Sequence, residues 1–301
     1  CVLFLLVASF VSQTAAIVSP SARDSYGRIS PADVEYSVDL PWFEDSEVEG
    51  LATDGQYFYV STAKTLFDTG DAWLYKFLQN GTFKEGIRIS EGTLDHAGGI
   101  VFHEGLLWVP LSERNPTPNI ASKIVRYDSN LNYFDTWQNS SERGNDHWGA
   151  VVVLPELSKV YIANWGTSRL YVYNPDATFV HLVDDPPSNN IQDWVVVENV
   201  LYGSQPGSDT SSIQVWETDD ETGTDLQLVG SMRTEGASSG LTWFNGSFWS
   251  CSGIGHATLY RLVNLVLEPA EPVFPPAMVI VAALSVLGVA AIVLGILRRR
   301  R

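Results

Sequence analysis

A repeat of about 45–50 residues is the feature that most limits how this chain can fold. Five units each begin with a short apolar run that ends in a turn. The runs are anchored at Gly50, Gly98, Gly149, Asp193 and Gly240, which are 48, 51, 44 and 47 residues apart. Two further apolar runs follow each anchor, and a fourth run is legible in four of the units. Units of four short strands at this period are typical of β-propeller blades.

The composition of the runs supports strands and not helices. They are rich in Val, Ile, Tyr, Phe and Trp, they are bounded by Gly, Asn, Asp and Pro, and no window has sustained helical spacing. The fifth unit lacks a fourth strand, whereas the segment VEYSVDL (34–40) is a strand with no unit of its own. We therefore predict an all-β, five-bladed propeller over residues 30–265, with 34–40 completing the last blade and closing the ring.

The two ends of the chain differ from this middle part. Residues 1–16 are an apolar run followed by small residues, which predicts a signal peptide truncated at its start, because neither Met nor a basic segment precedes it. Residues 277–297 carry no charge and are long enough to cross a bilayer. The Pro-rich stretch 266–276 then predicts a stalk, and the arginines at 298–301 a cytoplasmic tail.

These ends predict a single-pass cell-membrane protein whose body is extracytoplasmic. A Pro-rich stretch, an apolar helix and an arginine cluster also resemble sorting tails that a sortase-like protease removes. That alternative stays open.

The net charge limits the classes of partner that this chain is expected to bind. The formal net charge of −17 argues against nucleic acid and anionic lipid, and it fits cations, basic partners or a plain solvated acidic surface. After removal of the signal peptide only Cys251 remains, so no intramolecular disulfide is expected. Sequons at Asn80, Asn139 and Asn245 predict N-glycosylation of an exported chain.

Residues just before the anchors predict a site at one mouth of the propeller channel. Asp-His precedes the anchor of both the second and the third unit, and the fourth unit adds two amide side chains. The predicted ligand-binding residues are Asp95, His96, Asp146, His147, Trp148, Trp165, Asn190 and Gln192. Trp148 and Trp165 are included because they are placed where a ligand could stack.

Three roles remain open for the two mouth histidines. His96 and His147 could tie blades together through hydrogen bonds, bind a ligand or a divalent metal ion such as Zn²⁺, or act with the aspartates as a general base. No HxH or HExxH spacing is present and no nucleophile stands out. His103 and His181 are placed away from the mouth, and Cys251 is predicted to be inert core.

Several segments resemble a known family. EGLATDGQYFYVS, HAGGIVFHEGLLWVPLSE, SKIVRYD, DHWGAVVV and NWGTSRLYVYN, within residues 48–205, resemble an uncharacterised secreted propeller family catalogued as a domain of unknown function. That resemblance implies a propeller and no particular activity.

Two more remote resemblances concern enzymes. VEGLATDG is similar to blade starts of five-bladed glutamine cyclotransferases, although DHWG replaces their acidic-Gly-Trp motif in the third unit. Lactonase-like propellers hold calcium with Glu, Asn and Asp, and here Glu49, Asn190 and Asp193 loosely imitate that set.

The sequence as a whole predicts a membrane-anchored propeller that binds an extracellular ligand or protein through its channel mouth. The alternative is an enzyme in the same channel, either a metal-assisted hydrolase or lactonase, or a cyclotransferase-like enzyme. A passive spacer is the third possibility.

Overall fold

The computed structural model describes the chain in thirteen stretches. These are 34–40, 46–64, 71–114, 121–143, 146–165, 169–184, 191–206, 211–218, 226–234, 239–253, 257–263, 265 and 268–269. The predicted signal peptide, membrane helix and arginine tail lie outside these residues. Within the described stretches, no helix combines the length and apolar character needed to cross a bilayer.

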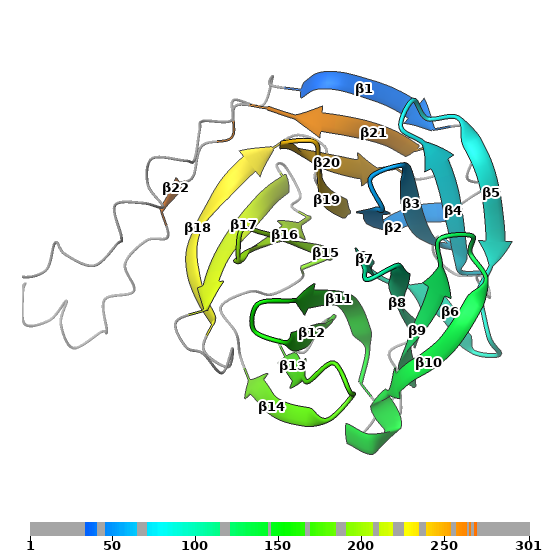
Figure 1. The fold of residues 1–301 in the computed structure, drawn as a ribbon, viewed down its shortest axis with the longest axis vertical. Helices are drawn as coiled ribbons and strands as arrows, with labels where there is room; N and C mark the ends of the chain where they lie inside the picture. The colour runs from blue at the N-terminus through cyan, green and yellow to red at the C-terminus, as the bar shows by residue number, and fades with distance from the viewer. Residues whose placement is uncertain are drawn as a thin grey trace, which may run out of the picture. The chain divides into compact units, whose positions relative to one another are not determined.

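Five antiparallel sheets stand around a common axis (Figure 1). Blade 1 contains β2 (Ser46–Thr53), β3 (Tyr57–Lys64), β4 (Trp73–Leu78) and β5 (Phe83–Arg88). Blade 2 contains β6 (Leu94–Ala97), β7 (Val101–His103), β8 (Leu106–Glu113), β9 (Ser122–Asp128) and β10 (Tyr133–Asn139), which the short 3₁₀ helix Ser140–Arg143 follows. Blade 3 contains β11 (Trp148–Leu154), β12 (Lys159–Asn164), β13 (Arg169–Tyr173) and β14 (Phe179–Asp184).

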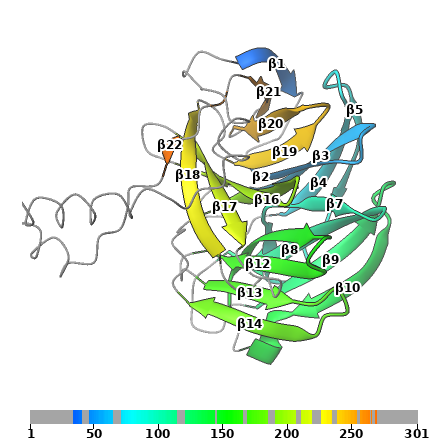
Figure 2. The same cartoon turned by 60° about the vertical axis from the view of Figure 1, so that its left-hand side comes forward.

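The last two blades complete the ring (Figure 2). Blade 4 contains β15 (Asp193–Val197), β16 (Val200–Gln205), β17 (Ser211–Thr218) and β18 (Leu226–Thr234). Blade 5 contains β19 (Gly240–Phe244), β20 (Ser247–Ser252), β21 (Ala257–Leu262) and, from the start of the chain, β1 (Val34–Leu40). The two-residue β22 (Glu268–Pro269) is the last described element. The predicted all-β five-bladed propeller is thus confirmed.

The N-terminal strand closes the ring as predicted. β1 pairs antiparallel with β21, with Val34 opposite Leu262 and Leu40 opposite Ala257. The sheet order is β1-β21-β20-β19, so the first strand in sequence is the outermost strand of the last blade. The outer edge of β21 is therefore paired, and its backbone N–H and C=O groups have partners.

The hydrophobic core lies between the blades. Five buried clusters are present, and each combines side chains of two neighbouring blades. Tyr59 of blade 1 and Leu107 of blade 2 share one cluster, and Leu40 of blade 5 joins Phe77 of blade 1 in another. Each blade therefore buries both of its faces, which is why the strands read as nearly continuous apolar runs.

Inner strands approach so closely that side chains are excluded, as expected at a propeller axis. A Cβ on Gly98 would lie 1.9 Å from the carbonyl oxygen of Gly149, and a Cβ on Gly240 would lie 2.6 Å from the Cβ of Leu51. Blade 2 has an irregular inner strand. The inner strand of blade 2 does not start at Gly98 but is split into β6 and β7 around it, because Gly99 bridges to Ala150 of blade 3 instead.

Serine hydroxyls bond one blade to the next. Ser61 Oγ in β3 donates to the carbonyl of Gly98 at 2.7 Å, and Ser112 Oγ in β8 donates to the carbonyl of Trp148 at 2.8 Å. Ser204 Oγ in β16 donates to the carbonyl of Ser239, which precedes β19. In each case the second strand of one blade donates to a carbonyl in, or directly next to, an inner strand of the following blade.

A single buried carboxylate joins four blades at the centre. Asp193, the first residue of β15, is fully buried, and its Oδ2 accepts the backbone N–H groups of Leu51 (2.7 Å) and Leu241 (2.8 Å). Its Oδ1 accepts the N–H of Trp194 at 3.0 Å, and the N–H of Ile100 is a fourth donor to the carboxylate. Burial raises the pKa of Asp193 well above its usual range, while the four N–H donors oppose that shift.

We predict that Asp193→Asn strongly destabilises the propeller although it changes no volume. An amide offers only one acceptor oxygen, so backbone donors would face an NH₂ group, and each buried donor without an acceptor costs about 1–3 kcal/mol. Denaturant unfolding should show this loss, whereas Asp71→Asn, which breaks an exposed pair with Arg88, should cost less than about 1 kcal/mol. Equal stability of Asp193→Asn and the parent chain would contradict the central role of this carboxylate.

Candidate functional site

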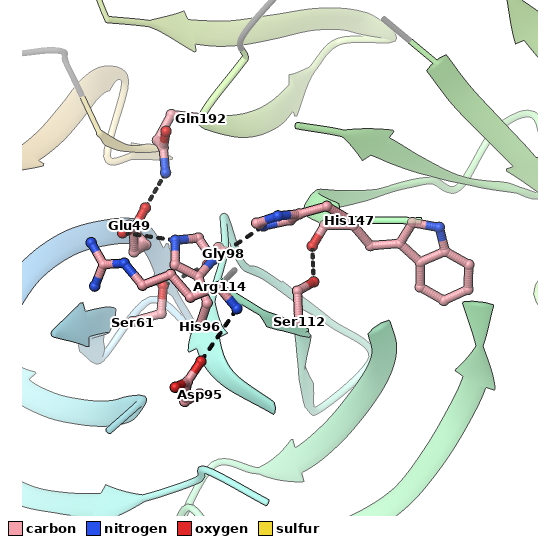
Figure 3. Close-up of polar contacts among 10 residues, drawn as sticks. Glu49, Ser61, Asp95, His96, Gly98, Ser112, Arg114, His147 and Gln192 are labelled. Carbon is pink, nitrogen blue, oxygen red and sulfur yellow. Dashed lines mark hydrogen bonds and ion pairs between the residues drawn. The ribbon is translucent and has the colours of Figure 1, made fainter. Parts of the chain in front are cut away.

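Four polar side chains from four blades meet near the axis (Figure 3). His147 Nε2 lies 3.3 Å from His96 Nδ1, and His96 Nε2 lies 3.2 Å from Glu49 Oε1. The side-chain amide of Gln192 donates to the other oxygen of Glu49. Blades 1 to 4 thus contribute one side chain each to a continuous polar network. We call these four residues the mouth network.

The mouth network forms where inner strands begin. His147 and Gln192 directly precede β11 and β15, while His96 and Glu49 lie within β6 and β2. The pairing register of β2 shifts between Val48 and Gly50, which makes Glu49 the extra residue of a β-bulge. Bulges re-aim side chains, and this one turns Glu49 toward its neighbours from blades 2 and 4.

The donor and acceptor roles within the mouth network follow from the chemistry of its side chains. The Glu49 carboxylate can only accept, so His96 donates from Nε2 and, when neutral, accepts at Nδ1. His147 must then donate from Nε2. Burial, followed by the nearby His96, lowers the pKa of His147 to about 3, so this imidazole is neutral at pH 7. When His96 is neutral as well, the hydrogen bonds run in one direction, from His147 through His96 to Glu49.

The two predicted Asp-His pairs do not form carboxylate–imidazole pairs. Asp146 Oδ1 accepts the backbone N–H of His147 at 3.1 Å, and its Oδ2 accepts from Tyr171 (2.5 Å) and Arg169 (3.3 Å). Asp95 Oδ1 accepts the backbone N–H of Arg114 at 3.3 Å, as Figure 3 shows. The aspartates hold the backbone around the histidines. The carboxylate that contacts His96 is that of Glu49, which the Asp-His pattern did not predict and which sits at the bulge in β2.

Of the two tryptophans predicted to stack on a ligand, Trp148 cannot do so. Its side chain is fully buried and packs edge-on against Tyr171 and Tyr173, at ring-centroid distances of 5.9 and 6.3 Å. The prediction for Trp148 is corrected accordingly: it belongs to the core between blades 2 and 3. Trp165 is partly exposed, and its backbone N–H donates to the carbonyl of His147 at 2.9 Å. Asn190 lies outside the described residues.

Glu47 adds a second carboxyl to the site. Burial raises the pKa of Glu47, and the Glu49 charge raises it further, while Arg114 and His96 lower it. Nη1 of Arg114 is buried and has no hydrogen-bond partner among the described residues. The two like charges of Glu47 and Glu49 on β2 therefore repel each other, and Arg114 and His96 compensate for this repulsion only in part.

A metal ion remains a prediction that the structure does not test. Across the described stretches, no group of three or more His, Cys, Asp and Glu side chains is arranged as a metal site. The 3.3 Å between nitrogens of His96 and His147 is nevertheless compatible with one zinc at about 2.0–2.1 Å from each. The calcium set implied by lactonase-like propellers is not formed in that way, because backbone N–H groups occupy the oxygens of Asp193.

The residues that the sequence placed outside the mouth lie outside the mouth network in the structure. His103 ends β7 and His181 is exposed in β14, and Cys251 is fully buried in β20, where burial raises the pKa of its thiol. The sequon asparagines Asn80, Asn139 and Asn245 are all exposed. Their exposure is compatible with the predicted glycosylation, which stays a prediction.

The fold is that of a β-propeller, with a network of four polar side chains near its axis. Residues 39–179 match the family described as "Family of unknown function (DUF6454)", so the predicted resemblance to an uncharacterised propeller family is confirmed over that segment. A comparison with curated proteins found no match.

Solved structures that resemble this chain share its fold. A family 117 glycoside hydrolase from the marine bacterium Zobellia galactanivorans has a TM-score of 0.52 at 12% identity, covering 82% of this chain and 96% of that one. A GH43 protein from Bacillus licheniformis has a TM-score of 0.49 at 12% identity, covering 79% and 60%. A luciferin-regenerating enzyme has a TM-score of 0.44 at 9% identity, covering 81% and 97%. At 12% identity, the match to the family 117 glycoside hydrolase shows a similar fold alone.

The depressed pKa of His147 predicts a loss of stability in mild acid. The unfolded chain takes up a proton near pH 6.5, whereas folded His147 does so only near pH 3, so this contribution is complete above pH 6.5 and falls as pH drops. Between pH 6.5 and pH 5 the loss is about 2 kcal/mol. In His147→Gln this part of the pH dependence should disappear in urea unfolding at the two pH values.

The exposed His181 supplies the control, since His181→Gln should keep the pH dependence of the parent chain. If His147→Gln loses as much stability as the parent over this interval, folded His147 is already protonated at pH 5.

Proposed function

We propose that this propeller is a binding module that takes a small cation, or the cationic group of a larger partner, at its channel mouth. The observation that carries the proposal is the mouth network, in which four blades each supply one polar side chain to the same place. Perturbed ionisable groups that converge in this way mark candidate functional sites. Here His147 has a lowered pKa and Glu47 a raised one.

The charge of the site supports a cationic ligand. Glu47 and Glu49 stand two residues apart on β2, and the repulsion between them contributes to the raised pKa of Glu47. A bound cation would relieve that repulsion and would favour the ionised form of Glu47. The net charge of −17 would also attract cations to the whole molecule.

One observation favours the enzyme alternative. The contact between Glu49 and His96 is the carboxylate–imidazole arrangement that orients a general base. The serines nearest the network donate their hydroxyls to backbone carbonyls, so neither Ser61 nor Ser112 is placed as a nucleophile. An enzyme at this site would therefore activate water, with or without a metal.

Cation binding is tested by thermal unfolding of the full chain with Zn²⁺, Ca²⁺ or putrescine. A ligand at a hundred times its dissociation constant adds about 2.7 kcal/mol, so at least one of the three should raise the melting temperature saturably. Glu47→Gln and Glu49→Gln should weaken the effect, whereas Glu85→Gln, on the exposed strand β5, should not. Binding should also weaken as pH falls through the raised pKa of Glu47, because the protonated carboxyl loses its charge.

No stabilisation by any of the three cations, or equal binding by the Glu49→Gln variant, would refute the proposed site. One equivalent of zinc in the purified protein, lost in the double variant His96→Ala and His147→Ala, would favour the metal-assisted enzyme instead.

We further propose that the propeller is held outside the cytoplasm by a single membrane helix. The uncharged run 277–297, the arginines 298–301 and the predicted signal peptide support this placement. Protease added to intact cells or spheroplasts should degrade the propeller while a cytoplasmic marker protein survives. Protection of the propeller until lysis would show the opposite orientation, and release of a chain that lacks residues 277–301 would favour the sorting-tail alternative.

A further inference from the structure

A groove separate from the channel mouth lies where the ring closes. It has a volume of about 480 Å³, and its lining includes Tyr36, Asn80, Phe244, Asn245, Trp249 and Arg261. These residues come from both blades that meet at the closure, blade 5 with its strand β1 and the β4–β5 turn of blade 1. The groove falls within the usual size range for small-molecule sites, about 300–1,000 Å³. None of its lining residues belongs to the mouth network.

One wall of the groove is the ring of Tyr36, which packs against the aromatic side chains beneath it. Tyr36 remains 44% exposed although it is a large side chain. Its ring packs edge-on against Trp249 at 6.1 Å, and Trp249 in turn contacts Phe58 and Phe244 at 5.2 and 6.3 Å. The exposed ring therefore rests on a buried aromatic cluster and is oriented before any ligand arrives.

The other walls carry polar side chains, and several of these have hydrogen-bond donors or acceptors that remain available to a ligand. Arg261 Nη1 pairs with Glu35 at 2.7 Å, and its Nε donates to Ser247 at 3.2 Å, so the guanidinium is fixed in the wall. Gln79 donates to the carbonyl of Gly55 at 2.9 Å, which leaves its amide oxygen as an acceptor.

The two asparagines lie in tight turns. Asn80 Oδ1 accepts the N–H of Thr82 at 3.1 Å, which leaves its NH₂ group as a donor. Asn245 has φ of 51° in an Asn-Gly turn. Its side-chain amide makes no hydrogen bond among the described residues, so both its donor and its acceptor are available.

We propose that this groove binds a saccharide. A sugar ring presents an apolar C–H face and an edge of hydroxyls. The C–H face of the sugar can stack on the exposed ring of Tyr36. Its hydroxyls can form hydrogen bonds with the side-chain amides and with the Arg261–Glu35 ion pair. A purely apolar ligand would leave these polar groups without partners. A small ion would not use the aromatic wall.

The saccharide can come from two sources. Asn80 and Asn245 both belong to N-glycosylation sequons and both line the groove, so a glycan attached to either one starts inside it. A free glycan from outside the protein has the same chemistry. The experiment below distinguishes the two.

The test uses the full chain from a bacterial host that attaches no N-glycans, held in a detergent without a sugar headgroup. The probes are N,N′-diacetylchitobiose, the disaccharide at the base of N-linked glycans, and cellobiose. Saturation-transfer NMR and calorimetric titration should show saturable binding of at least one of them. Tyr36→Ala should weaken binding roughly tenfold, equivalent to about 1.4 kcal/mol.

Tyr133→Ala is the matched control. Tyr133 is 56% exposed on β10 of blade 2, away from the groove, and its loss should leave binding unchanged. Both variants should retain the melting temperature of the parent chain, because neither removes a buried side chain. Failure of both disaccharides to bind, or equal binding by Tyr36→Ala, would overturn the proposal.

A second preparation, from a host that attaches N-glycans, identifies the source. If mass spectrometry finds glycans on Asn80 or Asn245 and free disaccharide binds only after their enzymatic removal, the groove holds the protein's own glycan. If these asparagines are unmodified and binding persists, the groove takes a free saccharide. Glycans on both asparagines with undiminished binding of free disaccharide would show that binding occurs elsewhere, and would overturn the proposal.

Discussion

The buried carboxylate of Asp193 is the interaction on which the rest of this propeller depends. Each blade is a complete antiparallel sheet, so hydrogen bonds within a blade cannot set its angle to the next one. Asp193 accepts N–H groups of Leu51, Ile100, Trp194 and Leu241, and therefore fixes inner strands of four blades relative to one point. The charge of a carboxylate is costly to bury, and these four donors are what make that burial tolerable.

The geometry of the mouth network depends on how Asp193 positions the blades relative to one another. Its contacts of about 3 Å join side chains from four different sheets, so a small rotation of one blade would separate them. Gln192, which holds Glu49, directly precedes Asp193 in the chain. The residue that fixes the axis therefore also positions a member of the network. This proximity couples stability to any function at the mouth, and it makes the variants Glu47→Gln and Glu49→Gln, which leave Asp193 untouched, the appropriate probes of binding.

The two proposed sites use different features of the fold. The mouth network consists of buried or partly buried side chains that lie at or near the starts of inner strands, beside close-packed glycines. The groove at the ring closure is lined by residues of all four strands of blade 5 and by the β4–β5 turn of blade 1, and the large side chain of Tyr36 stays exposed there. It exists only because β1 crosses from the start of the chain to blade 5. Ring closure thus stabilises the fold and also creates a second concave surface.

The sequence by itself determined the five blades and their closure, because apolar runs, turns and repeat length can be read directly along the chain. The segment 34–40 had no unit of its own, and the fifth unit was the one that lacked a fourth strand. The register of the repeat also brought His96, His147 and Gln192 to one place. Only the tertiary structure decided that Glu49 contacts His96, because a one-residue bulge in β2 reverses which side chains face the axis. Packing between blades likewise decided that Trp148 is core, because its side chain shares a buried cluster with Trp108 and Trp137 of blade 2.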